Sequence, residues 1–528
     1  MNRSPRVFLA FLLLMPAGLM ADPPGVFALV GGRVHSVSSA PIENGTVIIR
    51  DGLIERVGAG IPVPADAVII EAAGLNVYPG LFDAQTTLGL QTSTSRGSSG
   101  GETAPQSSTE PSARNRASQQ LRLSAETLDG KRSTGVTTVL VAPTAGNFNG
   151  QSVILNLGDG ELSSLILKDP ASAQISFNTK SWGTFPDSLM GAIYLARQTL
   201  LDAQWLATAR GIYERDPRGR KRPEATADLE ALAPVLRREI PVVFMAHDQV
   251  RMLRAADIGK EFGLRWVVSG ALEAWEVADL LKEREATVLL GVDFPKKPSI
   301  NEEDQSLAQI RDRVLSPTGA AELARRNVPF ALVSGPSLSS GGFIDGIRKV
   351  INAGLSEQDA LRAVTLAPAR IFAVDRQIGS LEAGKIANVF VTEGKFWEKD
   401  AEVRQLFIDG RQIRLTPESV DEESDESTPG EGSWDLTIRT PGGEISMHVA
   451  LSITSGRVGG SFSGDRGSGE IRDGAIDGSS LSFTLSAQTA PGGETSDWRF
   501  SGTVEGNSIA GEVSNSLGTF QFTGRKPE

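Results

Sequence analysis

The sequence predicts an α/β protein organised around a barrel of alternating strands and helices, followed by a separate all-β module. Between residues 77 and 374, short apolar runs alternate with amphipathic stretches, as a TIM-like (β/α)8 barrel requires. After an acidic segment at 416–432, the composition changes to short β-like runs separated by glycine turns. That rhythm is typical of an antiparallel sandwich or a small barrel at 433–528.

The composition of the 528 residues indicates an acidic globular protein with a large core. Its net charge of −12 argues against nucleic acid as a partner. The chain has no cysteine, which excludes disulfides, thiolate nucleophiles and cysteine metal sites. It has only three histidines, His35, His247 and His448. His35 and His448 fall in expected outer strands, and we assign them no role in a site.

Residues 1–21 resemble a secretory signal peptide. Arg3 and Arg6 give a basic start, and an apolar run at 7–14 leads to a small-residue exit. The run is short for a membrane span and is followed by Pro16. No other segment is long and apolar enough to cross a bilayer. We therefore expect an exported protein, periplasmic or extracellular, with no transmembrane span after signal removal.

Local patterns place most elements of the barrel in order. Ser356 is a good N-cap for the last helix, and an acidic residue follows three positions later. The fourth barrel strand is not placed by any pattern. The stretch 89–119, rich in Ser, Thr, Gly and Pro, is expected to be a mobile lid or a disordered insert over the barrel mouth. Strands are expected at 77–90, 137–142, 240–246, 266–268, 287–291 and 330–333, and helices at 188–210, 228–239, 249–262, 274–284, 318–326, 343–353 and 356–366.

The stretch Val77–Leu90, VYPGLFDAQTTLGL, resembles the first barrel strand of the amidohydrolase superfamily, where PGL-x-D-A-H-T-H supplies a metal-binding His-x-His pair. LAPARIF at 366–372 and GSLEAGKIANVFV at 379–391 are similar to later segments of that superfamily. The chain is most similar to exported bacterial members near the imidazolonepropionase-like group. The resemblance implies that the flanks 22–76 and 375–415 pair into a composite β-sandwich beside the barrel.

The resemblance also implies where metal ligands would lie, at the C-terminal ends of the barrel strands. The family pattern is His-x-His on strand one, often Lys or Glu on strand four, His on strands five and six, and Asp on strand eight. Of the four histidines in the family pattern, this chain has only the one on strand five. A zinc site needs three protein ligands plus water. We therefore expect no catalytic residue and no metal, or a divalent ion such as Zn if the chain is active. The pocket positions are Gln85 and Thr87 on strand one, His247 on strand five, Ser269 on strand six, and Ser334 with Gly335 on strand eight.

Other side chains could in principle compensate. Lys168 and Lys180 are the lysines nearest to the expected fourth strand, and we expect both at the surface. The Gly/Ser run at 334–342 precedes a helix and could present N–H groups to an anion. Carboxylates without the spacing of a cluster occur near expected strand ends, and the first of them is expected to support strand one: Asp83, Asp248, Asp293 and Asp345.

Three functions remain open. The first is a pseudoenzyme whose barrel mouth binds a small molecule or an active amidohydrolase paralogue, with oligomers possible because the superfamily often forms them. The second is an active metal-dependent hydrolase of C–N bonds in amides or cyclic amides, with an atypical site. The third is an envelope-binding protein acting through the C-terminal module at 433–528, which otherwise docks or packs on the barrel.

Overall fold

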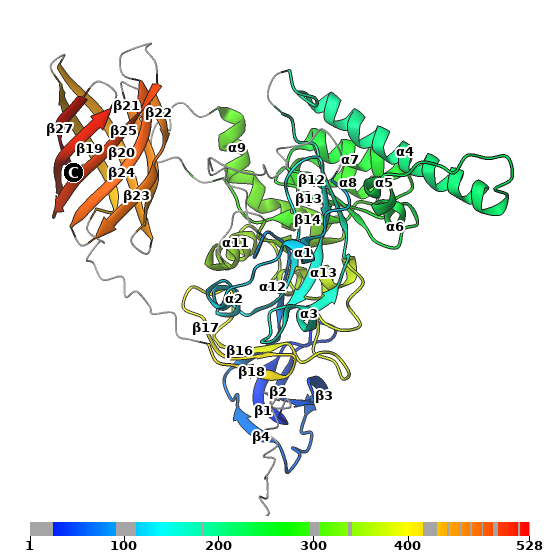
Figure 1. Cartoon of the computed structure of the whole chain (residues 1–528). Coiled ribbons are helices and arrows are strands. Elements are labelled where there is room, and N and C mark those ends of the chain that lie inside the picture. The colour runs from blue at the N-terminus through cyan, green and yellow to red at the C-terminus, as the bar shows by residue number, and fades with distance from the viewer. Residues whose placement is uncertain are drawn as a thin grey trace, which may run out of the picture. The chain divides into compact units, whose positions relative to one another are not determined.

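The chain folds into an α/β unit, residues 1–416, and an all-β unit, residues 417–528 (Figure 1). The expected signal peptide, and most of the 89–119 loop and the acidic linker, lie outside the residues that the structure describes. The structure is a computed structural model and describes residues 25–90, 112–180, 183–295, 297, 306–335, 340–415, 430–440, 443–454, 457–464, 467–477, 479–488, 495–515 and 518–526.

A mixed sheet joins the two flanks of the barrel, which confirms the predicted composite layer. β16 pairs antiparallel with β5, so that Val391 lies opposite Val77. The spatial order is β18-β17-β16-β5-β1-β2-β3, and β4 pairs with β1. The strands are β1 (Phe27–Val34), β2 (Ile42–Arg50), β3 (Leu53–Ala59), β4 (Val68–Glu71), β5 (Asn76–Pro79), β16 (Val389–Glu393), β17 (Glu402–Ile408) and β18 (Arg411–Ile413).

The TIM-like barrel predicted from the sequence is confirmed. Two sheets make its wall, ordered β10-β9-β7-β6 and β15-β14-β13-β12-β11-β8, and β8 runs on into β9. The wall closes where the Gly335 N–H donates to the Gln85 carbonyl at 3.0 Å. The strands are β6 (Leu81–Thr86), β7 (Val136–Val141), β8 (Phe148–Gln151), β9 (Val153–Asn156), β10 (Ile166–Lys168), β11 (Ala173–Ser176), β12 (Val242–Ala246), β13 (Trp266–Gly270), β14 (Val288–Gly291) and β15 (Phe330–Val333).

One side of the barrel departs from the expected strand–helix alternation. The stretch Phe148–Asn156 runs antiparallel to all three strands that pair with it, β7, β10 and β11. β11 follows it and pairs in parallel with β12, so β11 is the fourth strand that the sequence left unplaced. The antiparallel stretch escaped prediction because both of its faces are buried, which leaves no alternation of apolar and polar residues to read.

Helices cover the barrel, and the N-cap predicted at Ser356 is confirmed. The Ser356 hydroxyl accepts from the Asp359 N–H at 3.1 Å. The helix expected at 228–239 is two short ones, because Pro234 lacks the N–H that would continue the ladder. The helices are α1 (Ala117–Gln120), α2 (Ala125–Arg132), α3 (Leu162–Leu165), α4 (Leu189–Arg215), α5 (Ala227–Ala231), α6 (Ala233–Leu236), α7 (Gln249–Glu261), α8 (Ala274–Glu283), α9 (Leu307–Leu315), the 3-10 turn η2 (Ser316–Thr318), α10 (Gly319–Arg325), α11 (Ser340–Asn352), α12 (Glu357–Ala363) and α13 (Leu366–Ile371).

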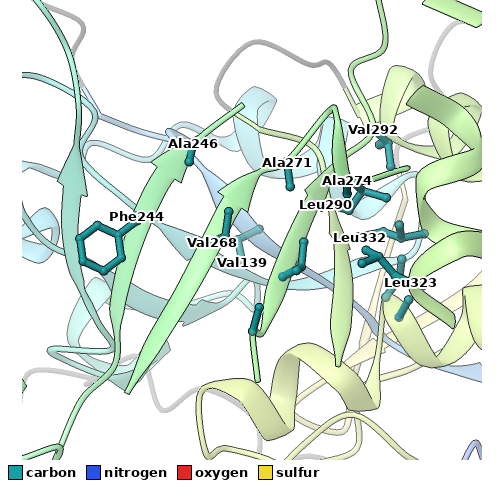
Figure 2. Close-up of a cluster of buried hydrophobic side chains, with 14 of the residues drawn as sticks. Val139, Phe244, Ala246, Val268, Ala271, Ala274, Leu290, Val292, Leu323 and Leu332 are labelled. Atoms are coloured by element: carbon teal, nitrogen blue, oxygen red, sulfur yellow. The ribbon is translucent and has the colours of Figure 1, made fainter. Parts of the chain in front are cut away.

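Alternate strand residues separate an outer core from an inner one, as the period of two requires. Outward-facing side chains such as Val268, Leu290 and Leu332 pack against Ala274 and Leu323 of the surrounding helices (Figure 2). Inward-facing side chains form a second cluster that also includes residues of α13. The barrel interior is therefore filled below its mouth. The inner members on the strands are Phe82, Ala84, Leu140, Ile154, Val243, Val267, Leu289, Ala331 and Val333.

The all-β unit is a closed antiparallel barrel, which decides between the predicted sandwich and barrel. Its order is β20-β19-β27-β26-β25-β24-β23-β21-β22, and a β20–β21 pairing closes it. Trp434, Trp498 and the stacked rings of Phe483 and Phe500, 4.7 Å apart, are buried inside. The strands are β19 (Gly432–Thr440), β20 (Gly443–Thr454), β21 (Arg457–Gly464), β22 (Gly467–Glu470), β23 (Arg472–Asp477), β24 (Ser480–Gln488), β25 (Thr495–Glu505), β26 (Ser508–Asn515) and β27 (Gly518–Arg525).

Within the described residues, none of the helices has the length and apolar character needed to span a membrane. Binding of envelope components by the C-terminal barrel stays a prediction.

Candidate functional site

The Pro79–Gly80 step places the first barrel strand. There the chain leaves the composite sheet as β5 and enters the barrel as β6. A Cβ atom on Gly80 would lie 2.0 Å from the Thr137 Oγ1 atom, so only glycine fits this crossing. The Gly80 N–H donates to the Asn388 carbonyl at 2.8 Å, which ties the crossing to the composite sheet. This junction fixes the height at which Gln85 meets the barrel mouth.

Gln85 reaches across the top of the barrel. Its amide Nε2 lies 3.5 Å from the Sδ atom of Met245, which belongs to β12 on a distant part of the wall. The Gln85 side chain is buried, and no residue that the structure describes donates a hydrogen bond to its Oε1 atom. Thr87, the other strand-one position, is half-buried just beyond the end of β6. An uncharged amide therefore stands where the family places a metal-binding imidazole.

His247 follows β12 and lies against the backbone of β13. A Cβ atom on Gly270 would be 2.4 Å from the His247 Nδ1 atom, so this glycine makes room for the ring. The residue is exposed as a whole, but the protein around its ring partly desolvates it, which lowers the pKa of His247; the nearby charges of Asp248, which raises it, and Arg251, which lowers it, act less strongly. The imidazole is therefore a neutral group near pH 7.

Ser269 and Gly335 complete the described part of the mouth. Ser269 is buried at the end of β13, beside Met245 in the sheet, and its Oγ atom has no hydrogen-bond partner among the described residues. Gly335 has a φ of 79°, and a Cβ atom there would meet no atom of the described residues within 4 Å. Open space thus lies at the strand-eight position where the family carries its aspartate. Both positions present small uncharged groups.

Ser334, expected in the pocket, points elsewhere. Its Oγ donates to the Asp83 Oδ2 atom at 2.6 Å, and its N–H donates to Oδ1 at 3.0 Å. Phe82 and Ala84 belong to the inner cluster, so Asp83 between them faces the outer side of the wall. Ser334 is therefore a tie between β15 and β6. Adjacent strand residues point in opposite directions, which is why Gly335 and not Ser334 faces the mouth.

Asp83 also forms a buried ion pair that the sequence analysis missed. The Lys131 Nζ atom donates to Asp83 Oδ2 at 2.8 Å, and the side chains are only 5% and 0% exposed. Lys131 lies on α2, 48 positions away. The carboxylate accepts from Lys131 and twice from Ser334, so it supports the strand as expected. It is not available as a metal ligand at the mouth.

The other carboxylates considered in the sequence are also engaged or remote. Asp248 caps α7 by accepting from the Arg251 N–H at 2.8 Å and pairs with the Arg251 side chain. Asp345 pairs with Arg348 on α11. Asp293 is exposed. Among the described residues, no three His, Asp or Glu side chains lie where they could share a metal ion.

The two lysines near strand four behave differently from each other. Lys168, expected at the surface, is half-buried on β10, and its Nζ donates to the Phe372 carbonyl at 2.7 Å. Burial, with a smaller contribution from Arg265, lowers its pKa. Lys180 lies in the segment after β11, where its N–H donates to the Pro186 carbonyl at 2.7 Å. Neither contact places a lysine among the mouth residues.

Two further polar residues of the wall were not found from the sequence. Gln174 lies on β11 between Ala173 and Ile175, which pack outward, so Gln174 faces the interior. Asn149 of β8 donates from Nδ2 to the Ala145 carbonyl at 3.0 Å. Gln174 Oε1 and Asn149 Oδ1 are both buried, and within the described parts of the chain neither accepts a hydrogen bond. Their strands were the unplaced ones, and the only available signal was the polar content of NFNGQS and AQIS.

The donor set at the mouth does not fit the divalent metal that the fold implies. Gln85 offers one neutral carbonyl oxygen, Ser269 one hydroxyl and His247 one imidazole. Zinc takes Cys, His and carboxylate ligands, and catalytic sites supply three of them. Magnesium and calcium need several oxygens with negative charge among them. We therefore derive no chemical step through a metal ion.

A TIM-like barrel with a composite sheet made from its two flanks defines the class as amidohydrolase-like. Residues 276–413 match the profile of the family described as "Amidohydrolase family". A crystal structure of an amidohydrolase from Thermotoga maritima MSB8 shares the fold, with a TM-score of 0.64 and 24% identity over 74% of this chain and 99% of that chain. The profile match and the shared fold support the assignment to the amidohydrolase superfamily that the motifs predicted.

Two other comparisons are more limited. A Xaa-Pro dipeptidase structure aligns with a TM-score of 0.44 and 15% identity over 74% of this chain and 100% of that chain. A dihydroorotase of Geotalea daltonii is 45% identical over 53 residues, which are 10% of this chain and 12% of that protein. The chain thus matches about an eighth of the length of that curated relative.

Proposed function

We propose that this chain is a non-catalytic amidohydrolase homologue whose barrel mouth binds a small uncharged molecule. The observation that carries the proposal is the replacement of the ligand set: Gln85, Ser269 and Gly335 hold positions of two imidazoles and one acid. The scaffold motifs around them are retained, including the Gly80 crossing and the Asp83 tie. Substitution confined to the metal-binding positions fits a changed task for the same pocket.

The chemistry of the mouth indicates the class of ligand. Gln85 Oε1 at the mouth, and Asn149 Oδ1 and Gln174 Oε1 on the wall strands, are buried amide oxygens to which no described residue donates. The orientation of the Asn149 amide is fixed, because its Nδ2 already faces two backbone carbonyls. A buried acceptor left unpaired costs about 1–3 kcal/mol, which a ligand bearing N–H or O–H donors would recover. We expect an amide, a lactam or a polyol, and no anion.

Metal analysis tests the first half of the proposal. Protein purified without chelators should contain far less than one equivalent of Zn, Mn or Fe, and added Zn²⁺ should not raise its melting temperature. A rebuilt variant carrying Gln85→His, Thr87→His, Ser269→His and Gly335→Asp serves as the comparison, and it should gain zinc. Near-stoichiometric metal in the natural protein, lost in His247→Ala, would show that the site is a metal centre.

Ligand binding tests the second half. Thermal-shift screening of uncharged amides, lactams and polyols should give hits that Gln85→Leu weakens by about tenfold, the equivalent of one hydrogen bond of ~1.4 kcal/mol. Gln198→Leu, on the outer helix α4, is the matched control and should leave binding unchanged. Equal binding by the two variants would place the ligand outside the barrel mouth.

A further inference from the structure

Helix α4 has apolar side chains on two opposite faces. One face packs on the barrel through buried residues that include Ala196, Leu200 and Ala203. The other is exposed to solvent and defines the α4 stripe, which comprises Met190, Tyr194, Leu201, Trp205 and Ile212. At 3.6 residues per turn these five positions fall within an arc of about 60°, roughly opposite the buried face. Figure 1 shows α4 on the outer side of the barrel unit, next to α5 and α7.

The exposure of the α4 stripe is large. Met190 is 80% exposed and Trp205 is 62% exposed. From Met190 to Ile212 the stripe runs about 33 Å along the helix. The apolar area it presents is on the order of 500 Å², at the upper end for the largest patch on a monomeric protein. A surface of this size and continuity is typical of a protein–protein contact.

The spacing of the α4 stripe is self-complementary. Met190 and Ile212 lie at equal distances, eleven positions each, on either side of Leu201. In an antiparallel pair of α4 helices related by a two-fold axis at Leu201, Met190 of each copy therefore meets Ile212 of the other. Trp205 of each copy then faces Arg197. A two-fold contact needs the same patch to match itself in this way.

A groove lies where the partner's methionine would arrive. The C-terminal half of α4 and the following segment enclose a hollow of about 480 Å³, lined by Trp205, Ile212, Tyr213 and residues 220–224. Met190 is the most exposed member of the stripe, and methionine fills irregular gaps well. The groove therefore has the position to receive it, and Trp205 and Ile212 offer apolar contacts beside the mostly charged residues 220–224.

Charge also favours the antiparallel arrangement. Asp187 precedes the helix, and residues 214–224, at and after its C-terminal end, carry five basic and three acidic side chains, a net positive charge. Antiparallel pairing brings the acidic start of each helix to the basic end of the other. It also sets the two helix dipoles in opposition.

We propose that a second copy of this chain covers the α4 stripe, forming a two-fold antiparallel dimer with Leu201 at the axis and Met190 of each copy in the groove of the other. The area is below the roughly 800 Å² per partner of a standard interface, which predicts a dimer that dissociates on dilution. This inference is independent of what the barrel mouth binds.

Mass measurement and cross-linking test the dimer. At tens of micromolar, the full chain should show twice its 56.0 kDa mass and dissociate on dilution. Leu201→Glu and Met190→Glu should each raise the dissociation constant at least tenfold. Ala207→Glu, exposed on the same helix but away from the stripe, should not. If the chain is a monomer at every concentration, the proposal is overturned, even if a different protein covers the α4 stripe. A dimer whose dissociation constant is unchanged by Leu201→Glu would overturn it as well.

Because the chain contains no cysteine, single cysteines report the register directly. Leu201→Cys should form an intermolecular disulfide under mild oxidation. Ile212→Cys alone should not, since the two copies of residue 212 would be about 33 Å apart. The double variant Met190→Cys/Ile212→Cys should cross-link again. Cross-linking by Ile212→Cys alone, or its absence in Leu201→Cys, would refute the antiparallel arrangement.

Discussion

Removing either charge of the Asp83–Lys131 pair is expected to destabilise the barrel strongly. In Lys131→Met, the carboxylate keeps its two hydrogen bonds from Ser334 but loses its countercharge in a site with 0% exposure. In Asp83→Asn, the ammonium group of Lys131 is left buried and unpaired. Breaking a buried pair by removing one partner costs about 3–5 kcal/mol, so each variant should lose that much stability.

The double variant Asp83→Asn/Lys131→Met tests the cause. With both charges gone, no uncompensated ion remains, and the loss should be smaller than the sum of the single losses by at least ~2 kcal/mol. Lys395→Met is the matched control. Its pair with Glu357 is exposed, with 40% and 49% of the side chains accessible, and should contribute at most about 1 kcal/mol.

Stability is measured by urea unfolding, followed by tryptophan fluorescence. All variants are fitted with one common slope of unfolding free energy against urea concentration, so that a shift of the midpoint reports a change in stability. Circular dichroism at low urea checks that each variant folds. Single losses below about 1 kcal/mol, or a double loss equal to the sum of the two, would refute the assignment of Asp83 and Lys131 as a coupled buried pair.

Three further predictions concern the frame around the site. Gly80→Ala should destabilise the barrel by more than ~3 kcal/mol in urea unfolding, because its Cβ would collide with Thr137, and Thr137→Ala should restore only part of the loss. Burial lowers the pKa of His35, which stacks on Tyr78; the unfolded chain therefore takes up a proton first, and stability falls as pH drops below about 6.5. His35→Phe should flatten that fall between pH 7 and 5 in melting curves, and an unchanged slope would contradict it. Ser356→Ala should cost about 1 kcal/mol through loss of the α12 N-cap, and Ser356→Asp should restore it.

Sequence patterns located the parts of the fold whose signal is local. The strand expected at 330–333 matches β15 residue for residue, and the glycine of the PGL motif lies at the crossing between the two sheets. Phe148–Asn156 was missed because the direction of a fully buried strand depends on its neighbours in space. Those neighbours, β7 and β11, are set by long-range pairing that no local pattern encodes.

The residues of the candidate site also fall into those that local sequence patterns could predict and those that they could not. The mouth positions on strands one, five and six could be read from the ends of the strands, because motif and strand end coincide there. Ser334 could not be separated from Gly335, since a shift of one residue reverses the face. The ion pair of Lys131 could not be predicted, because nothing near this lysine in the sequence indicates that it contacts a carboxylate 48 positions earlier.

The composite sheet has a consequence for how the chain is made. The Asn76 side chain donates to the Gly394 carbonyl across 318 positions, and β5 has no partner on that side until β16 exists. At roughly 5–20 residues per second of synthesis, β5 waits on the order of 15–60 s for its neighbour. The first strands therefore emerge with an open edge, and the α/β unit matures only after nearly all of it has left the ribosome.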